Sequence, residues 1–148
     1  MSNYNTITEI DTFMTLRLRT SAWDNASGGD KNASNSMATG IIDRLNFLGE
    51  RTVALQDNEF PRDEDTDIPQ TIKDAHSLIV LALLDGKEPE MEFENLTLIK
   101  HKYAQVLSEY DRSQLPPHIL AGVPSFEAWT ILKPYLRDGS RISMARVS

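Results

Sequence analysis

The sequence contains no cysteine among its 148 residues, which excludes disulfides and thiolate metal sites. It also lacks a long apolar run. The longest one, Leu78 to Leu84, is far shorter than the roughly 20 residues that a membrane-spanning helix needs. The polar stretch from Asn3 to Asp11 has no basic segment followed by an apolar one, as a signal peptide would. We therefore expect a soluble intracellular protein with no membrane association.

Catalytic and metal-binding motifs are missing as well. The three histidines lie far apart and lack the HExxH-like spacing that places two imidazoles on one metal ion. The triplet Asp63, Asp65 and Asp67 is similar to the start of a calcium loop, but Ile68 stands where such a loop requires glycine. We expect no enzymatic activity, no cofactor and no metal site.

Acidic residues outnumber basic ones by 22 to 15, which gives a net charge of −7. Phosphate binding depends on clustered Lys and Arg that release counterions, so this balance disfavours a protein that grips nucleic acid. It does not exclude a surface past which DNA slides. The acids crowd segments 57–67 and 85–94, whereas the C-terminal end is basic. Such polarity is typical either of simple solvation or of a stacked assembly that orients its partners.

Helical signals open the chain. The capping box Thr6-x-x-Glu9 predicts the start of a first helix. Gly28-Gly29 indicates a turn, after which Asp30 is placed to cap a second helix. The apolar spacing predicts that this helix runs to about Leu48 and is ended by Gly49.

A third helix is predicted to begin at Pro69 and to end at Gly86. Because its segment Leu78 to Leu84 is apolar all round, this helix should be the central one. Ser125 is expected to cap a short last helix, which Pro134 ends or kinks.

The remaining segments are less regular. Residues 50–68 show no sustained periodicity and predict a long acidic loop, and the prolines between 116 and 124 bracket a rigid connector. We expect a mainly α fold, a small bundle of about three to five helices over residues 1–136. Residues 137–148 are expected to form an extended C-terminal arm that docks in a groove of another protein.

Several pieces of the chain also form an ordered pattern. The first pieces are a helical Phe and Arg (Phe13 with Arg17), a Trp (Trp23) and a helix end (Ile42 to Gly49). The later pieces are a Gln followed by Phe-Pro-Arg (Gln56 with Phe60-Pro61-Arg62) and a Pro that starts a helix (Pro69). This pattern resembles a family of tailed-bacteriophage proteins filed as DnaT-like single-stranded DNA-binding proteins. Members of that family look like head-to-tail adaptors, also called connector or head completion proteins. The pattern covers most of residues 8 to 84, and the stretch 123–136 is similar to a helix near the family's C-terminus.

The resemblance implies a structural protein of the virion neck, assembled in the host cytoplasm. Such an adaptor forms a homo-oligomeric ring, dodecameric in the family, between the portal protein and a tail or nozzle protein. Double-stranded DNA passes through the ring without specific binding. The resemblance also favours a short β segment near 99–110, where the apolar spacing fits a helix, and both alternatives stay open.

Two other functions remain alternatives. The family's name indicates a single-stranded DNA-binding accessory protein of phage replication, whose binding would weaken steeply with salt. The second alternative is a small enzyme or a regulator, which only the long loop supports.

The residues expected to make contacts fall into two groups. One is expected to dock on the portal and lies in the arm: Arg137, Arg141, Ile142, Met144, Arg146 and Val147. The other is expected to face a neighbouring subunit or the tail: Arg17, Arg44, Phe60, Pro61 and Arg62. For Arg17 and Arg44, the alternative is solvated charge or an intramolecular pair with Asp43 or Glu9. For the last three, packing against their own domain is the default interpretation.

Overall fold

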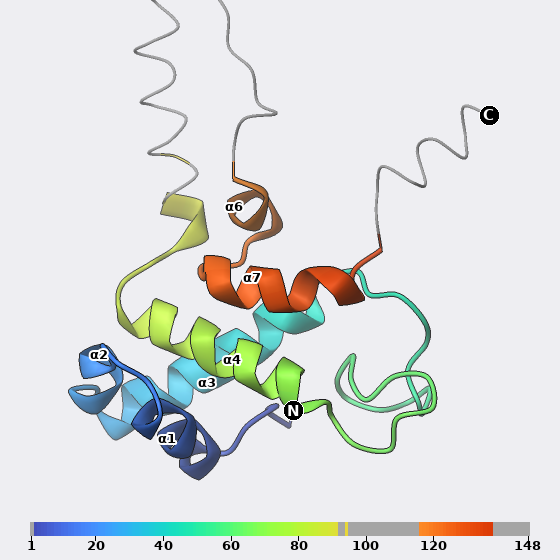
Figure 1. Ribbon diagram of the computed structural model, residues 1–148, viewed down its shortest axis with the longest axis horizontal. Helices are drawn as coiled ribbons and strands as arrows, with labels where there is room; N and C mark the ends of the chain where they lie inside the picture. Colours follow the sequence, from blue (N-terminus) through green and yellow to red (C-terminus); the bar gives the residue numbers. More distant parts are fainter. Residues whose placement is uncertain (1, 92–93, 95–115, 138–148) are drawn as a thin grey trace, which may run out of the picture.

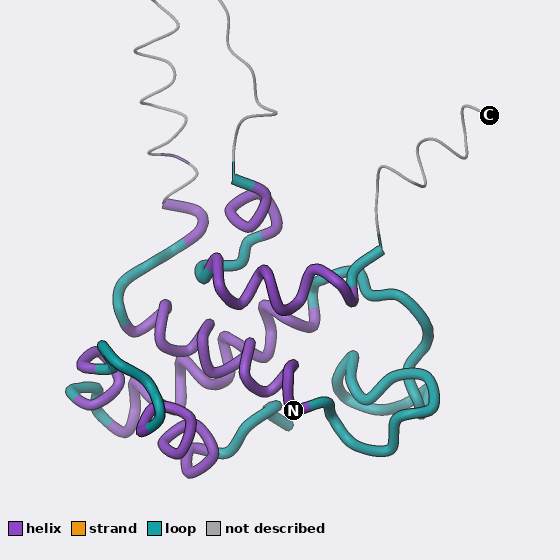
Figure 2. The backbone as a smooth tube through the Cα atoms, viewed as in Figure 1, coloured by secondary structure: helices purple, strands orange, loops and turns teal. Residues whose placement is uncertain are grey.

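The computed structural model describes residues 2–91, 94 and 116–137 (Figure 1). Its helices are α1 (Ile7–Thr15), α2 (Ser21–Asp24), α3 (Gly28–Asp43), α4 (Gln70–Leu84), α6 (Pro117–Ala121) and α7 (Phe126–Leu132), with a 3-10 turn, η2 (Lys133–Tyr135). Within these ranges there are isolated β-bridges but no strand, so the predicted mainly α fold is confirmed (Figure 2). Residues 138–148 of the arm and the alternative β segment near 99–110 lie outside the described residues.

Helix α4 is the centre of the fold, as its apolar sequence predicted. It packs along α3 and α7 and also contacts α1 and α2 (Figure 1). Ile72, Ile79 and Val80 are fully buried, and each such side chain stabilises the fold by about 1.5–3 kcal/mol. The last helical residue is Leu84, and Gly86 closes the helix as predicted. Its φ of 82° lets its amide and that of Lys87 turn back to the carbonyls of the last turn.

Local capping signals set where two helices begin. The Thr6 hydroxyl accepts the Glu9 amide at 3.2 Å, and the Glu9 carboxylate accepts the Thr6 amide at 2.7 Å. The predicted capping box of α1 is therefore confirmed. Ser125 caps α7 in the same way, because its hydroxyl accepts the Ala128 amide at 3.1 Å.

The start of α3 differs from the prediction. Ser27 is the N-cap, and its hydroxyl accepts the Asp30 amide at 3.1 Å. Gly28 and Gly29 consequently form the first turn of the helix rather than a separate turn. A serine one residue before two glycines supplies a better cap than Asp30, because it satisfies an amide that would otherwise lack a partner.

The end of α3 was also predicted wrongly. The helix ends at Asp43, well before Leu48. Beyond it the chain extends so that the Phe47 ring packs edge-on against the Phe60 ring at 4.7 Å and the Phe47 backbone bridges to Leu136. The packing of Phe47 against residues distant in sequence thus ends the helix at Asp43, although the helical apolar spacing continues to Leu48.

The predicted rigid connector is partly helical. Pro117–Ala121 form α6, which Pro116 precedes and Gly122 ends with a φ of 81°. Proline at the first helical position loses nothing, because its missing amide would have no partner there.

A buried polar network joins the N-terminal segment to α3 and α4. The Asn5 side-chain amide donates to the Lys73 carbonyl at 2.8 Å and lies 3.0 Å from His76 Nδ1. His76 Nε2 lies 3.1 Å from the Asn35 carbonyl and 3.1 Å from Thr39 Oγ1. Because a carbonyl only accepts, we assign the proton to Nε2, and Nδ1 accepts from Asn5. Burial lowers the pKa of His76 from 6.5 to about 4.

This pKa shift predicts that the fold weakens in mild acid. The unfolded chain binds a proton at His76 near pH 6.5, whereas the folded chain does so only near pH 4. Stability is therefore complete above pH 6.5 and falls towards pH 4, by up to about 1.4 kcal/mol per pH unit. Urea unfolding at several pH values between 7 and 5 measures the slope.

His76→Gln should flatten this slope, and His118→Gln, at a half-buried histidine of α6, should leave it in place. A slope that persists unchanged in His76→Gln would show that another group takes up the proton.

Candidate functional site

Arg62 closes the long loop between α3 and α4. Its Nε donates to the Leu48 carbonyl at 2.9 Å, and its Nη2 to the Gly49 carbonyl at 2.6 Å. Its Nη1 donates to the carbonyl and the carboxylate of Glu59, at 3.2 and 2.6 Å. Only 8% of Arg62 is exposed. The planar guanidinium has several donors in a fixed arrangement, so this one side chain joins Leu48 and Gly49, at the start of the loop, to Glu59.

The neighbouring Phe60 also points into the protein. It is 3% exposed, follows on to Pro61 through a cis peptide bond, and lies edge-on to the rings of Tyr4, Phe47 and Tyr135. Phe60 and Arg62 therefore pack against their own domain, the default interpretation for this stretch. Pro61 is half-buried between them.

Gly49, expected to end a helix, is part of this closure instead. Its φ is 75°, and a Cβ built on it would lie 2.3 Å from the carboxylate oxygens of Asp63. That carboxylate accepts the Glu50 amide at 3.0 Å, and the Asp63 amide donates to the Glu50 carbonyl at 2.7 Å. Position 49 thus requires glycine for both its backbone conformation and its close approach to Asp63.

Gln56 orders the outer part of the loop. Its Nε2 donates to the carbonyls of Asn58 and Pro61, both at 2.8 Å, and its Oε1 accepts the Val53 amide at 3.0 Å. The resulting turn, Val53 to Gln56, is called the loop tip below. It holds Val53 and Leu55 out in solvent, with 60% and 94% of their surface exposed.

Asp43 ties the loop to the N-terminal segment. Its carboxylate accepts the Tyr4 hydroxyl and, at 3.1 Å, the Glu59 amide. Burial raises the pKa of this carboxyl, and burial together with the Asp43 contact raises the pKa of the Tyr4 phenol. The next residue, Arg44, is exposed, so its contact with another subunit stays a prediction.

A groove of about 750 Å³ lies between residues 16–19, which follow α1, the second half of α4 and the start of α7. Exposed apolar side chains line it: Leu16 and Leu18 after α1, and Phe126 at the start of α7. Helix α4 begins directly after the loop and ends at the groove. The two surfaces therefore lie towards opposite ends of α4 (Figure 1).

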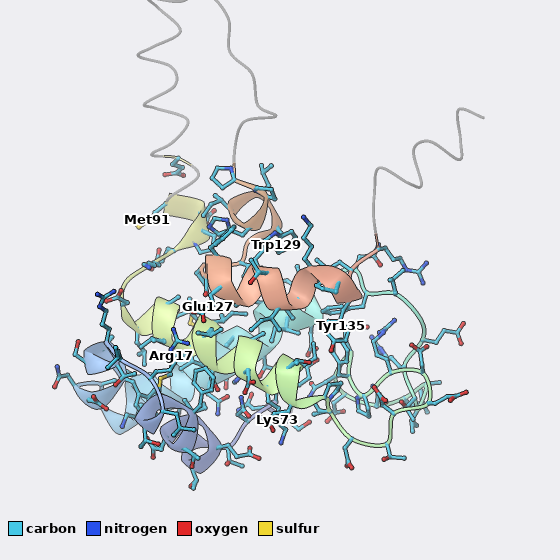
Figure 3. The ribbon with its side chains drawn as sticks, in the orientation of Figure 1. Arg17, Lys73, Met91, Glu127, Trp129 and Tyr135 are labelled. Atoms are coloured by element: carbon cyan, nitrogen blue, oxygen red, sulfur yellow. The ribbon has the colours of Figure 1, made fainter. Side chains whose placement is uncertain are left out.

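Arg17 spans the base of this groove. Its guanidinium forms a bidentate pair with Glu127, at 2.8 and 3.1 Å, which joins the segment after α1 to α7 (Figure 3). Of the interpretations left open for Arg17, the intramolecular pair is the one observed, but with a different partner from Asp43 or Glu9. Glu9 is paired with Lys73 instead.

Arg137 is the one predicted portal-docking residue within the described part of the chain. Its amide donates to the Asn46 carbonyl and its Nε to the Phe47 carbonyl, both at 2.9 Å. These bonds fix the point beside the loop from which residues 138–148 continue. The other predicted docking residues lie outside the described residues: Arg141, Ile142, Met144, Arg146 and Val147.

Comparison with protein-family models, with curated proteins and with solved structures finds no match. In the described ranges no three His, Asp or Glu side chains are placed to hold a metal ion. None of the helices in those ranges combines the length and the apolar character that crossing a membrane requires.

The Arg62 closure predicts a large loss of stability on conservative substitution. Arg62→Lys keeps the charge but cannot reach the same acceptors, so the partly buried carbonyls of Leu48, Gly49 and Glu59 lose their partner. We expect a loss of about 2–4 kcal/mol in the free energy of unfolding, measured in urea.

Arg51→Lys is the matched control, because Arg51 pairs with the same Glu59 at 2.6 Å but is exposed. An exposed ion pair is screened by solvent and contributes little to stability, so this variant should stay close to the parent. Equal effects of the two substitutions would contradict the closure.

Proposed function

We propose that this chain is a structural virion protein, a head-to-tail adaptor that forms a ring between the portal and the tail. The observation that carries the proposal is that separate pieces of the adaptor-like pattern meet in space. Arg62 of the Phe-Pro-Arg stretch binds the carbonyls of Leu48 and Gly49, which end the earlier stretch, and Gln56 binds Pro61. Residues that contact one another depend on one another. The pattern therefore describes one structural unit rather than unrelated matches.

The work of such a protein is mechanical. Four acidic side chains on the outer surface of the loop are exposed: Asp57, Glu64, Asp65 and Asp67. Negative charge on a channel wall repels DNA phosphate, so the genome passes during ejection without adhering. This use of the acidic balance fits better than a gripping role, which requires clustered cations.

The arm supplies the link to the portal. Residues 138–148 include Arg141 and Arg146 alternating with the apolar Ile142, Met144 and Val147. A segment of this kind binds by laying its apolar side chains in a groove while its cations pair at the rim. The bonds of Arg137 to the Asn46 and Phe47 carbonyls anchor its root, so tension on the arm reaches the folded domain.

The mass of the protein in solution tests this function. Alone at low concentration we expect a monomer, and with the portal of the same virus a closed ring on that portal. A protein that ignores the portal but shifts in mass with single-stranded DNA at low salt would favour the replication accessory function instead.

Deletion of residues 138–148 should abolish portal binding and leave the fold intact, because the core is formed by residues between Tyr4 and Leu136. Urea unfolding should change by less than about 0.5 kcal/mol. Portal binding is measured by co-sedimentation, with a variant whose residues 138–148 are shuffled as a control for length and charge. Full-affinity binding by the truncated chain would refute the docking role of the arm.

A further inference from the structure

The loop tip and the groove have matching apolar surfaces. Leu55 on the tip is 94% exposed, and on the groove Leu16, Leu18 and Phe126 are 85%, 87% and 62% exposed. Large exposed apolar side chains that lie close together are more often part of a contact surface than left in solvent. Leu55 is surrounded by solvent, whereas the groove is a recess of about 750 Å³, so it has room for such a side chain.

Their charges are opposite. The tip is followed by exposed acids that take part in none of the ion pairs formed among the described residues: Asp57, Glu64, Asp65 and Asp67. In the groove Glu127 neutralises Arg17. This leaves Arg19 and Lys87 as the excess cations, with Asp85 as the remaining acid. An acidic projection is thus placed to meet a basic recess.

Both surfaces are held in shape before any contact forms. Gln56 fixes the tip through its bonds to Val53, Asn58 and Pro61. The bidentate pair of Arg17 with Glu127 joins the two walls of the groove. Surfaces that are ordered in advance lose little conformational entropy on binding.

We propose that the loop tip of one copy docks in the groove of the next copy, which rests on the proposed adaptor function and names its subunit contact. Because the tip and the groove lie at opposite ends of the molecule, this contact joins copies head to tail (Figure 1). Contacts of this type give a closed ring when the rotation between copies closes, and a filament when it does not.

The contact is small, so it should be weak between free copies. When the arms hold several copies side by side on the portal, the effective concentration of each tip near the next groove rises sharply. The ring is therefore expected to close on the portal and to fall apart without it.

The chain has no cysteine of its own, so cross-linking through introduced cysteines tests the proposal without competing native disulfides. A chain with Leu55→Cys is mixed with a chain with Leu18→Cys under mild oxidation, on the portal and at high protein concentration. Both positions are exposed, so the variants should fold as the parent does. We expect a mixed dimer as the main product, and a ladder of larger products from a chain that carries both substitutions.

Met37→Cys in place of Leu18→Cys is the matched control. Met37 is 55% exposed on α3 and belongs to neither surface, so its mixed product should be at least about tenfold less abundant. Leu55→Asp should lower the yield of rings on the portal by about tenfold, because it removes the apolar group that fills the groove.

The outcomes separate the two proposals. Rings on the portal without a link between positions 18 and 55 would overturn this contact and leave the adaptor function standing. A ladder of linked copies that never binds the portal would support the contact and refute the adaptor function. A link from Leu18→Cys to Val147→Cys in place of Leu55→Cys would assign the groove to the arm and overturn the proposal.

Discussion

The guanidinium of Arg62 is the contact on which the rest of the structure depends. The long loop between α3 and α4 has no helix or strand of its own, so its backbone groups need other partners. Arg62 supplies a partner to the carbonyls of Leu48, Gly49 and Glu59 at once. With the loop closed, Phe60 reaches the core, where it holds Phe47 and so determines where α3 ends.

The closed loop and the groove give the two ends of the molecule different surfaces. The chain leaves the closed loop and enters α4, whose far end forms one side of the groove. Because α4 is buried among α1, α2, α3 and α7, it fixes the loop and the groove relative to each other. A rigid body with unlike surfaces at its ends is the kind of unit from which heterologous rings are built. Arg137, the last described residue, is bonded to the Asn46 and Phe47 carbonyls at the start of the loop.

Local signals were sufficient for part of this fold. The capping box at Thr6, the end of α4 at Gly86 and its central place depend on neighbouring residues, and the sequence predicted them. The end of α3 depends on Phe47 meeting residues far along the chain, and no periodicity contains that information. The site was harder: Arg17 pairs with a residue 110 positions away, and the fully buried His76 contacts Asn5 and Asn35 from other segments. An arginine after Phe-Pro in an acidic loop was the available signal for the closure.

Amide hydrogen exchange in the loop tests the central claim, that this segment is a rigid element rather than a loose acidic connection. The Thr52 amide donates to the Pro61 carbonyl at 3.1 Å, and the Asp63 amide to the Glu50 carbonyl at 2.7 Å. Their exchange rates can be followed by NMR beside those of α3. The closure by Arg62 predicts protection comparable to that of the outer amides of α3. Exchange at the rate of an unstructured peptide would show that the loop is open in solution, and would contradict the account.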